Sequence, residues 1–266
     1  MLSSVNEARI LYYSSTNLLF NKSLKKEQRE VVRSHIDQMK GLRERIDHPQ
    51  IHSMYLLSEI YFHQIIQQDN RALSFCKQYL ELVQSEEALS SPQTLATAYG
   101  HLAQVNLRLF HLEDAQHYAI QTLELFSNEE MNYLQTLELL FIAQFYLNDL
   151  EAAIETLEQA FSHPEFHSTR ILAARWHYLK ACLLFSQEAY RDAYLTLNET
   201  APLLADKFGS NISIRLHEIM IMFDMGNHDL MEPKILNMRQ FIKRTQKSKE
   251  FLRANYLIQL LMYWYR

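Results

Sequence analysis

The segment His111-Leu-Glu-Asp-Ala115-Gln decides the fold, because its pattern is repeated along the chain: a polar turn, a small residue, then apolar residues at helical spacing. Three other segments share this pattern: Gln68-Asp-Asn-Arg-Ala72-Leu, Asn148-Asp-Leu-Glu-Ala-Ala153-Ile and Glu188-Ala-Tyr-Arg-Asp-Ala193-Tyr. The aligned alanines are 43, 38 and 40 residues apart. A fifth turn, Met225-Gly-Asn-His-Asp-Leu230, lies where the next unit should place one. The chain therefore has a repeat of about forty residues.

The sequence on both sides of each turn predicts a pair of helices. Apolar residues recur at helical spacing over stretches long enough for three or four helical turns. Ser91 followed by Pro92 has the pattern of an N-cap before the first residue of a helix. We therefore expect an all-α chain of about six antiparallel helix hairpins, and a repeat of this length built from helix pairs is typical of an α-solenoid.

The composition favours the same fold class. The 266 residues include 4 glycines, where an average usage of roughly 7% would give about 19. Sheet hairpins and phosphate-binding loops need residues at positive φ, which glycine adopts most easily. A chain with so little glycine has little room for such features. The net charge of −5 gives no overall attraction to nucleic acid or to an anionic membrane, and we expect no membrane partner.

The segment from Tyr99 to Thr122 resembles the tetratricopeptide repeat (TPR), whose first helix has the spacing W-x2-L-G-x2-Y and whose second has A-x3-F. The matching positions are Tyr99, Leu102 and Ala103 in the first helix and Ala115 and Ala119 in the second. Other units match in part, at Trp176 and Leu179 and at Ala153, Leu157 and Ala160. The resemblance implies a right-handed superhelical solenoid.

Three residues depart from the TPR pattern. Asn106 stands where the family has an aromatic residue, and Ile60 and Phe141 stand where it has a small one. The repeat is also longer than the family's 34 residues. Another α-solenoid geometry therefore stays open as an alternative.

We expect a single helical-repeat domain over residues 1–266, because no linker interrupts the pattern. Residues 1–46 predict an irregular N-terminal hairpin, residues 47–240 predict the TPR-like repeats, and residues 241–266 predict a C-terminal helix.

The resemblance implies that ligands lie on the concave face formed by the first helix of each pair. On this register the face consists of His52, Tyr55, Glu59, His63, Gln104, Arg108, Gln135, Glu138 and His177. This surface mixes amides, charges of both signs and aromatic rings. It lacks the Lys/Asn/Arg set with which chaperone-binding TPR proteins hold a C-terminal carboxylate. We therefore expect an extended peptide or a helix of a partner protein at this face.

A basic segment lies near the C-terminus. Lys234 to Arg253 include seven basic residues and one acidic residue, a net charge of +6 against −11 for the rest of the chain. Arg239, Lys243 and Lys247 recur every four residues and predict a basic stripe on one helix face. The stripe is interpreted either as a docking surface for an acidic partner or as a solvated outer face. Nucleic acid is not expected, because no aromatic residues interleave with these charges.

The last helix is rich in large apolar groups, among them Tyr256, Tyr263 and Trp264. A solenoid needs a polar outer face on its terminal unit. This helix is therefore expected either to pack onto the preceding hairpin or to form an interface with a partner or a second copy. A third alternative is that this chain is part of a longer polypeptide, the rest of which covers the helix.

No motif predicts catalysis, a metal or another cofactor. The histidine pairs have the i, i+4 spacing of zinc ligands, but each first histidine precedes a proline and so predicts a helix entry. These pairs are His48 with His52 and His163 with His167. Cys76 and Cys182 lie in apolar helical stretches and predict buried, reduced thiols of a cytoplasmic protein. We therefore expect a protein that is not an enzyme.

Two function hypotheses follow. In the first, the chain is a scaffold or adaptor subunit of a larger complex that binds proteins or peptides through its repeats. In the second, it is a peptide-sensing regulatory module that controls a partner effector, such as a protease, a kinase or a transcription regulator. Nothing in these residues resembles an effector, so the second hypothesis requires another chain.

Overall fold

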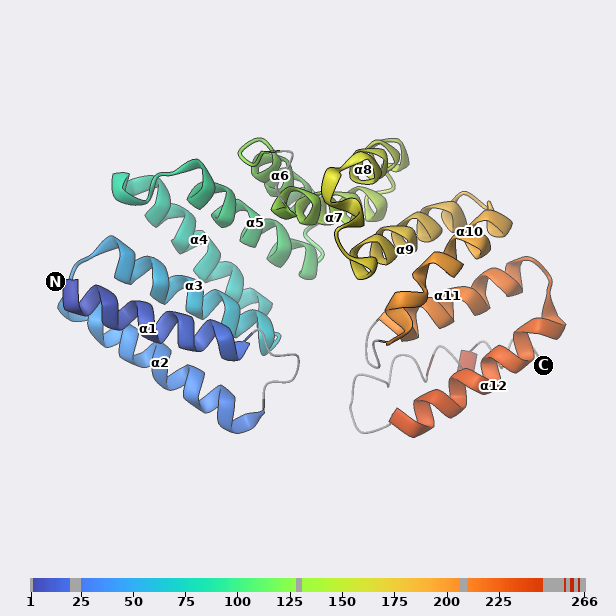
Figure 1. Ribbon diagram of the computed structural model, residues 1–266, viewed down its shortest axis with the longest axis horizontal. Helices are drawn as coiled ribbons and strands as arrows, with labels where there is room; N and C mark the ends of the chain where they lie inside the picture. Colours follow the sequence, from blue (N-terminus) through green and yellow to red (C-terminus); the bar gives the residue numbers. More distant parts are fainter. Residues whose placement is uncertain are drawn as a thin grey trace. The chain divides into compact units, whose positions relative to one another are not determined.

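The computed structural model describes residues 2–19, 25–127, 131–205 and 210–245, together with positions 256, 259, 260 and 263. Within these ranges there are twelve α-helices, three short 3-10 segments and no β-strand. The helices follow one another as six pairs (Figure 1). They are α1 (Leu2–Leu19) with α2 (Lys26–Arg45), α3 (Pro49–Ile65) with α4 (Asp69–Ser85), α5 (Pro92–Arg108) with α6 (Leu112–Leu123), α7 (Met131–Tyr146) with α8 (Leu150–Ser162), α9 (Arg170–Ser186) with α10 (Tyr190–Leu197), and α11 (Ser210–Asp224) with α12 (His228–Thr245). The predicted all-α chain of about six hairpins is confirmed.

Backbone contacts divide the chain into two compact units, residues 1–156 and 157–266, and each is described by itself. The expected single domain over 1–266, with its divisions after residues 46 and 240, stays a prediction.

Each hairpin turn from α3 onward contains one residue in the left-handed backbone region. These residues are Gln67 (φ 59°), Phe110 (φ 61°), Asn148 (φ 62°), Glu188 (φ 61°) and Gly226 (φ 71°). The N–H of the next residue donates to the carbonyl five residues before it; the bond from Gln68 N to His63 O is 2.9 Å long. This pairing is the Schellman motif, which satisfies carbonyls at the end of the first helix.

The repeated turn explains the repeated alanine. The residue five positions after each left-handed residue is buried, and these residues are Ala72, Ala115, Ala153, Ala193 and Met231. A small side chain there lets the second helix of the pair approach the first closely. The alanine register is confirmed. Four of the five left-handed residues are not glycine, so these helix hairpins adopt positive φ largely without it.

Replacing Glu188 with glycine is expected to raise the free energy of unfolding by about 0.5–1 kcal/mol. The left-handed conformation costs a non-glycine residue about 1–2 kcal/mol, and glycine's greater loss of backbone entropy offsets part of that gain. Urea denaturation measures the difference. Glu188→Ala is the matched control: equal stabilisation by alanine would mean that the carboxylate, not the backbone, is responsible.

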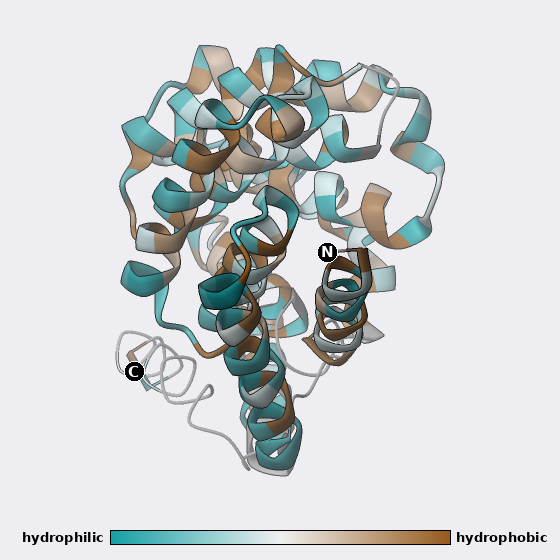
Figure 2. Ribbon diagram, turned by 90° about the vertical axis from the view of Figure 1, so that its left-hand side faces the viewer, coloured by the Kyte–Doolittle hydropathy of each residue, from teal (hydrophilic) through white to brown (hydrophobic). Residues whose placement is uncertain are grey.

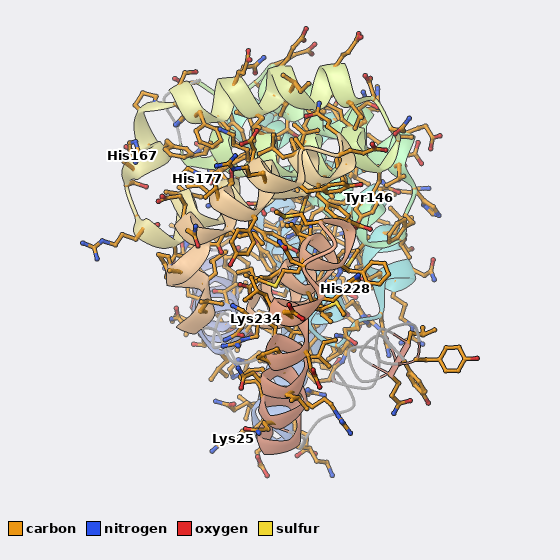
Figure 3. All side chains as sticks on the ribbon, turned by 90° about the vertical axis from the view of Figure 1, so that its right-hand side faces the viewer. Lys25, Tyr146, His167, His177, His228 and Lys234 are labelled. Carbon is orange, nitrogen blue, oxygen red and sulfur yellow. The ribbon has the colours of Figure 1, made fainter. Side chains whose placement is uncertain are left out.

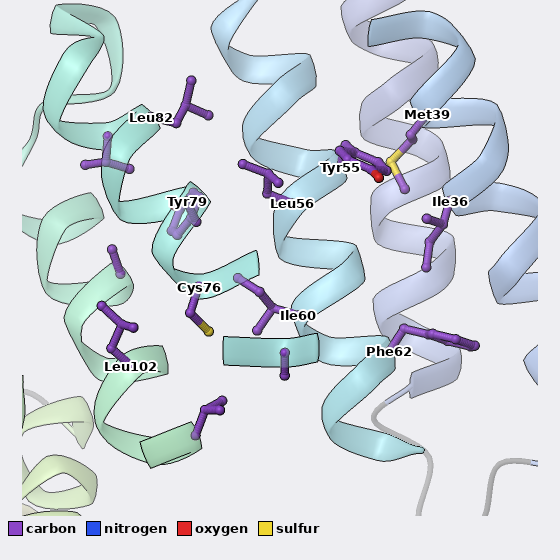
Figure 4. Close-up of a cluster of buried hydrophobic side chains, with 14 of the residues drawn as sticks. Ile36, Met39, Tyr55, Leu56, Ile60, Phe62, Cys76, Tyr79, Leu82 and Leu102 are labelled. Atoms are coloured by element: carbon purple, nitrogen blue, oxygen red, sulfur yellow. The ribbon is translucent and has the colours of Figure 1, made fainter. Parts of the chain in front are cut away.

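The core of the first unit forms where α3 packs against α2 on one side and α4 on the other. In Figure 4, buried side chains of the three helices lie close together: Ile36 and Met39 of α2, Leu56 and Ile60 of α3, and Cys76 and Tyr79 of α4. Hydrophobic and hydrophilic residues interleave along the helices (Figure 2), as expected for helices that bury one face only.

The second unit has a separate core. Trp176 of α9 is fully buried. Apolar residues of α9, α10 and α11 form one cluster, and α11 and α12 form another. The members of the second cluster are Ile219, Met222, Met231, Ile235 and Met238.

The departures from the TPR pattern have a local reason. Asn106 is buried four residues before the left-handed Phe110; its Nδ2 donates to Leu102 O at 2.9 Å and its Oδ1 lies 3.2 Å from His111 Nδ1. Gln144, at the same register, accepts a hydrogen bond of 2.8 Å from Thr156 Oγ1. In the first unit, polar side chains at this position therefore bind either the turn, as Asn106 does, or the second helix of the pair, as Gln144 does.

Candidate functional site

A pocket of about 600 Å³ lies over α3, and helices α2 and α4 bound it on either side. It is lined by Arg33 and Lys40 of α2, by Tyr55, Glu59, Phe62 and His63 of α3, by Ile66 and Gln68 of the following turn, and by Arg71, Ser74 and Phe75 of α4. Residues three or four apart on a helix share one face, which explains why Tyr55, Glu59 and His63 reach the pocket together. The volume is typical of ligand-binding pockets.

The Glu59 carboxylate is the buried centre of the pocket. Its side chain is 3% exposed, and its Oε2 lies 2.9 Å from Arg33 Nη1 and 3.4 Å from His63 Nε2. The Tyr55 hydroxyl also interacts with this carboxylate, which raises the pKa of the hydroxyl. Because a buried charge is tolerated only when it is paired and hydrogen-bonded, these three groups satisfy Glu59.

Arg33 holds α2 against α3. Besides Glu59, its guanidinium binds Asp37 on its own helix at 3.0 Å and lies over the Phe62 ring, 5.8 Å from the centroid. Three contacts in different directions therefore fix this side chain in one position.

Burial controls the protonation of the pocket. Burial lowers the pKa of His63, and although Glu59 opposes this effect, the charges of Arg71 and Arg33 add to it. Burial and the neighbouring carboxylate of Glu59 raise the pKa of Tyr55 to about 12. At neutral pH both rings are uncharged. The lining then carries three cations and one carboxylate, a net charge of +2.

The walls of the pocket are aromatic. The His63 ring stacks on Phe75, with centroids 5.6 Å apart and an interplanar angle of 10°. The Tyr55 ring meets Phe75 edge to face at 6.4 Å. These contacts fix the rings of Tyr55 and His63 beside Glu59, and Phe62 and Phe75 are part of the pocket lining.

The predicted partner-binding residues are distributed over several places. Tyr55, Glu59 and His63 come together in the pocket. His52 lies nearer the start of α3, half-buried, and both burial and the charge of Arg43 lower its pKa.

Gln104 and Arg108 bind the end of α3 and the start of α4. Gln104 Oε1 accepts a hydrogen bond of 3.0 Å from Gln64 Nε2. Arg108 donates to the backbone oxygen of Gln64 at 2.9 Å and pairs with Asp69 at 2.9 Å. These two side chains therefore fasten α5 to the preceding hairpin.

The remaining predicted contacts lie outside the pocket. Gln135 is exposed and Glu138 is half-buried on α7. His177, in the second unit, is half-buried with its ring edge-on to Phe161 at 5.2 Å, and His167 lies nearby (Figure 3).

The basic stripe and the C-terminal residues are described only in part. Arg239 is exposed on α12, while the side chain of Lys243 and all of Lys247 lie outside the described residues. Lys234, at the start of the basic segment, pairs with Glu218 at 2.6 Å. Tyr256 and Tyr263 are 65% and 78% exposed, and Trp264 also lies outside the described positions.

The two histidine pairs lie at helix starts, as predicted. His48 Nδ1 accepts a hydrogen bond of 3.3 Å from Gln50 N, and His163 Nδ1 accepts one of 3.1 Å from Glu165 N. Both are therefore N-caps. In the part of the chain that is described, no group of three His, Cys, Asp or Glu side chains could hold a metal ion, and no helix is long and apolar enough to cross a membrane.

Both cysteines are free thiols. Burial raises the pKa of Cys76 to about 12 and that of Cys182 to about 11. The Cys182 sulfur lies 3.6 Å from Nδ1 of His217. Because the thiolate is the reactive form, these protonated thiols are poor nucleophiles.

The basic and aromatic side of the pocket was not predicted from the sequence; it consists of Arg33, Lys40, Arg71 and Phe75. The predicted binding face lies on the first helices alone, whereas these four residues belong to second helices. The spacing held a usable signal: Arg33 and Lys40 are seven apart and Arg71 and Phe75 are four apart, so each pair shares a helix face.

Six successive helix hairpins, of which the five from α3 onward share one type of turn between their two helices, define a helical-repeat protein. No family model matches the sequence, and no curated protein is similar to it. Solved structures are similar in fold. The apo form of the quorum sensor NprR from B. thuringiensis has a TM-score of 0.77 at 14% identity, over 97% of this chain and 70% of that one. The apo form of RapI has a TM-score of 0.68 at 10% identity, over 98% and 81%. The TPR-like repeats of a kinesin light chain from Podosopora anserina have a TM-score of 0.54 at 16% identity, over 76% and 100%.

Within the helical-repeat class, this chain has the TPR-like fold, as the resemblance implied.

Proposed function

We propose that this chain is a protein- or peptide-binding scaffold or adaptor subunit of a larger complex. The observation that carries the proposal is the preformed pocket over α3, in which buried polar groups face an open volume between aromatic walls. Pockets of this kind, mostly apolar with a few fixed polar groups, are typical of ligand sites. The concave face expected from the first helices would extend the contact beyond the pocket.

A peptide suits the pocket better than a reacting substrate. Gln68 and Ser74 offer donors and acceptors for a main chain, and Phe62 and Phe75 offer apolar contact for a side chain. The Glu59 carboxylate is already bound to Arg33, Tyr55 and His63, which leaves it poorly suited to act as a general base. We therefore propose binding and not catalysis.

The test first selects peptides that bind the chain and then measures their affinity for a variant whose pocket is filled by a larger side chain. Heptapeptides selected against the purified chain from a random display library are expected to bind with measurable affinity in calorimetry. Ser74 is exposed on α4 at the pocket, so Ser74→Trp is expected to fill the opening and weaken binding by at least about tenfold. Glu81→Trp, exposed two turns further along α4, is the control and should leave the affinity unchanged. Failure to select any peptide, or equal losses in both variants, would contradict the proposal.

A peptide-sensing regulatory module that controls a partner protease, kinase or transcription regulator is the second candidate. The similarity to the quorum sensor NprR over 97% of this chain favours it. Thermal stabilisation by short peptides alone would support the sensor. Stable co-purification with one large protein would support the adaptor.

The C-terminal part supplies the remaining proposed contacts in a cytoplasmic complex. We propose that Arg239, Lys243 and Lys247 dock an acidic protein surface, and that Tyr256, Tyr263 and Trp264 contact a partner or a second copy. The amount of partner protein that co-purifies with the Lys243→Glu/Lys247→Glu variant tests the first contact. An amount equal to that of the wild type would show that the basic stripe is not part of the binding surface.

A further inference from the structure

The cations of the pocket are not equivalent. Arg33 is occupied by Glu59, Asp37 and the Phe62 ring. Lys40 and Arg71 are exposed and have no ion-pair partner among the described residues. They belong to α2 and α4, which lie on either side of α3. Two uncompensated positive charges therefore flank the pocket.

A cationic ligand does not fit this charge distribution. The carboxylate of Glu59 is the acidic group of the lining and is 3% exposed. A ligand cation would have to displace Arg33 from it while facing Lys40 and Arg71. Like charges brought together cost free energy, so the pocket selects against basic peptides.

An anionic ligand does fit. Carboxylates at the opening can pair with Lys40 and Arg71 without disturbing the network around Glu59. Beneath them, Phe62, Ile66 and Phe75 provide an apolar surface. Opposite charges on the two partners also speed their encounter and fix the register of the complex.

We infer that the pocket over α3 binds an acidic peptide segment, in which carboxylate side chains pair with Lys40 and Arg71 and an intervening apolar side chain lies against Phe62 and Phe75. The inference rests on the proposed function, because it names the chemistry of the peptide that the same pocket would bind.

Two synthetic peptides test the inference with the full chain. One is a blocked hexapeptide of sequence Glu-Glu-Leu-Glu-Glu-Leu, and the other replaces each glutamate with glutamine. Calorimetry is expected to show binding of the glutamate peptide at least about tenfold tighter than its analogue, with two weak ion pairs contributing. Raising the ionic strength is expected to reduce the difference, because salt screens exposed charges.

Charge reversal locates the site. Lys40→Glu/Arg71→Glu is expected to weaken binding of the glutamate peptide by more than about tenfold. Arg29→Glu/Lys77→Glu is the matched control, because it makes the same change of net charge at exposed positions of α2 and α4 outside the pocket. Circular dichroism melting checks that both variants are folded. An equal loss in both would mean that the total charge, not the pocket, attracts the peptide, and would overturn the inference.

The remaining outcomes are also decisive. Equal affinity for the two peptides, or enrichment of basic peptides in the library selection, would overturn the inference but leave the proposed function standing. Failure of every library peptide to bind would remove the proposed function as well. A competition assay separates peptide from nucleic acid. If a short oligothymidylate displaces the bound glutamate peptide at a lower concentration than added glutamate peptide does, the pocket is assigned to nucleic acid instead.

Discussion

Acidification from pH 7.5 to pH 4 is expected to destabilise the fold through two histidines, the half-buried His101 in the first unit and the buried His217 in the second. Burial lowers the pKa of each to about 4. His101 Nε2 is buried without a hydrogen-bond partner, and the ring meets Tyr61 edge to face at 5.1 Å. His217 packs edge-on against Phe185 at 4.9 Å. Among the residues that the structure describes, neither ring pairs with a carboxylate that could stabilise an added proton.

The direction of the effect follows from the lowered pKa. Unfolded histidine binds a proton near pH 6.5, whereas these folded histidines do not until about pH 4. Between these values the unfolded state binds more protons, so stability is full above pH 6.5 and falls as the pH decreases. The loss is about 3 kcal/mol for each residue at pH 4. The lowered pKa values of His52, His63 and His177 act in the same direction.

Urea denaturation at pH 7.5, 5.5 and 4 measures the loss of stability, and variants show which histidine causes it. His101→Leu is expected to flatten the pH dependence of the first unit and leave that of the second unchanged. His117→Gln replaces an exposed histidine on α6 and serves as the control. An unaltered pH dependence in His101→Leu would show that His101 is protonated as easily in the folded chain as in the unfolded one.

The repeat was readable from the sequence because the turn that generates it is local. The left-handed residue, the hydrogen bond over five residues and the buried alanine all lie within one short segment, as Phe110, His111 and Ala115 illustrate. Helix starts are equally local, and His48 and His163 cap their helices where the following prolines predicted a helix entry. The sequence could not indicate that Gln67, Phe110 and Glu188 would adopt positive φ, because turn geometry, not residue preference, imposes that conformation.

The pocket was only half predictable, because helical periodicity tells which residues share a face but not what packs against that face. Tyr55, Glu59 and His63 were correctly grouped, yet Glu59 is buried by an arginine 26 residues earlier, in the hairpin whose sequence is least regular. Gln104 and Arg108 were predicted to contact a partner, and the sequence did not indicate that both bind the preceding hairpin, at Gln64 of α3 and Asp69 of α4. Contacts between side chains of different helices depend on the relative positions of those helices.

The pair of Arg33 and Glu59 is expected to respond asymmetrically to mutation. Arg33→Met leaves the carboxylate of Glu59, 3% exposed, without its cation. Removing one member of a buried pair costs about 3–5 kcal/mol, and we expect the lower end because Arg33 is 40% exposed. Glu59→Gln leaves Arg33 free to keep Asp37, at 3.0 Å, or to turn to solvent, so its cost should be about 1 kcal/mol. The double variant Arg33→Met/Glu59→Leu should regain most of the stability, since apolar groups of similar volume often replace such a pair without loss.

The pH dependence of the Arg33→Met variant supplies an independent readout. Loss of the arginine removes one of the two positive charges that lower the pKa of His63, while Glu59, which raises it, stays at 3.4 Å. His63 should therefore take up a proton more readily and become the counter-ion of Glu59. A raised folded-state pKa adds stability below that pKa, so the cost of Arg33→Met should be smaller at pH 5.5 than at pH 7.5, and His63→Phe should abolish this rescue. Equal costs at both pH values, or a larger loss in Glu59→Gln than in Arg33→Met, would show that Arg33 acts through its packing on Phe62 and not as the partner of a buried carboxylate.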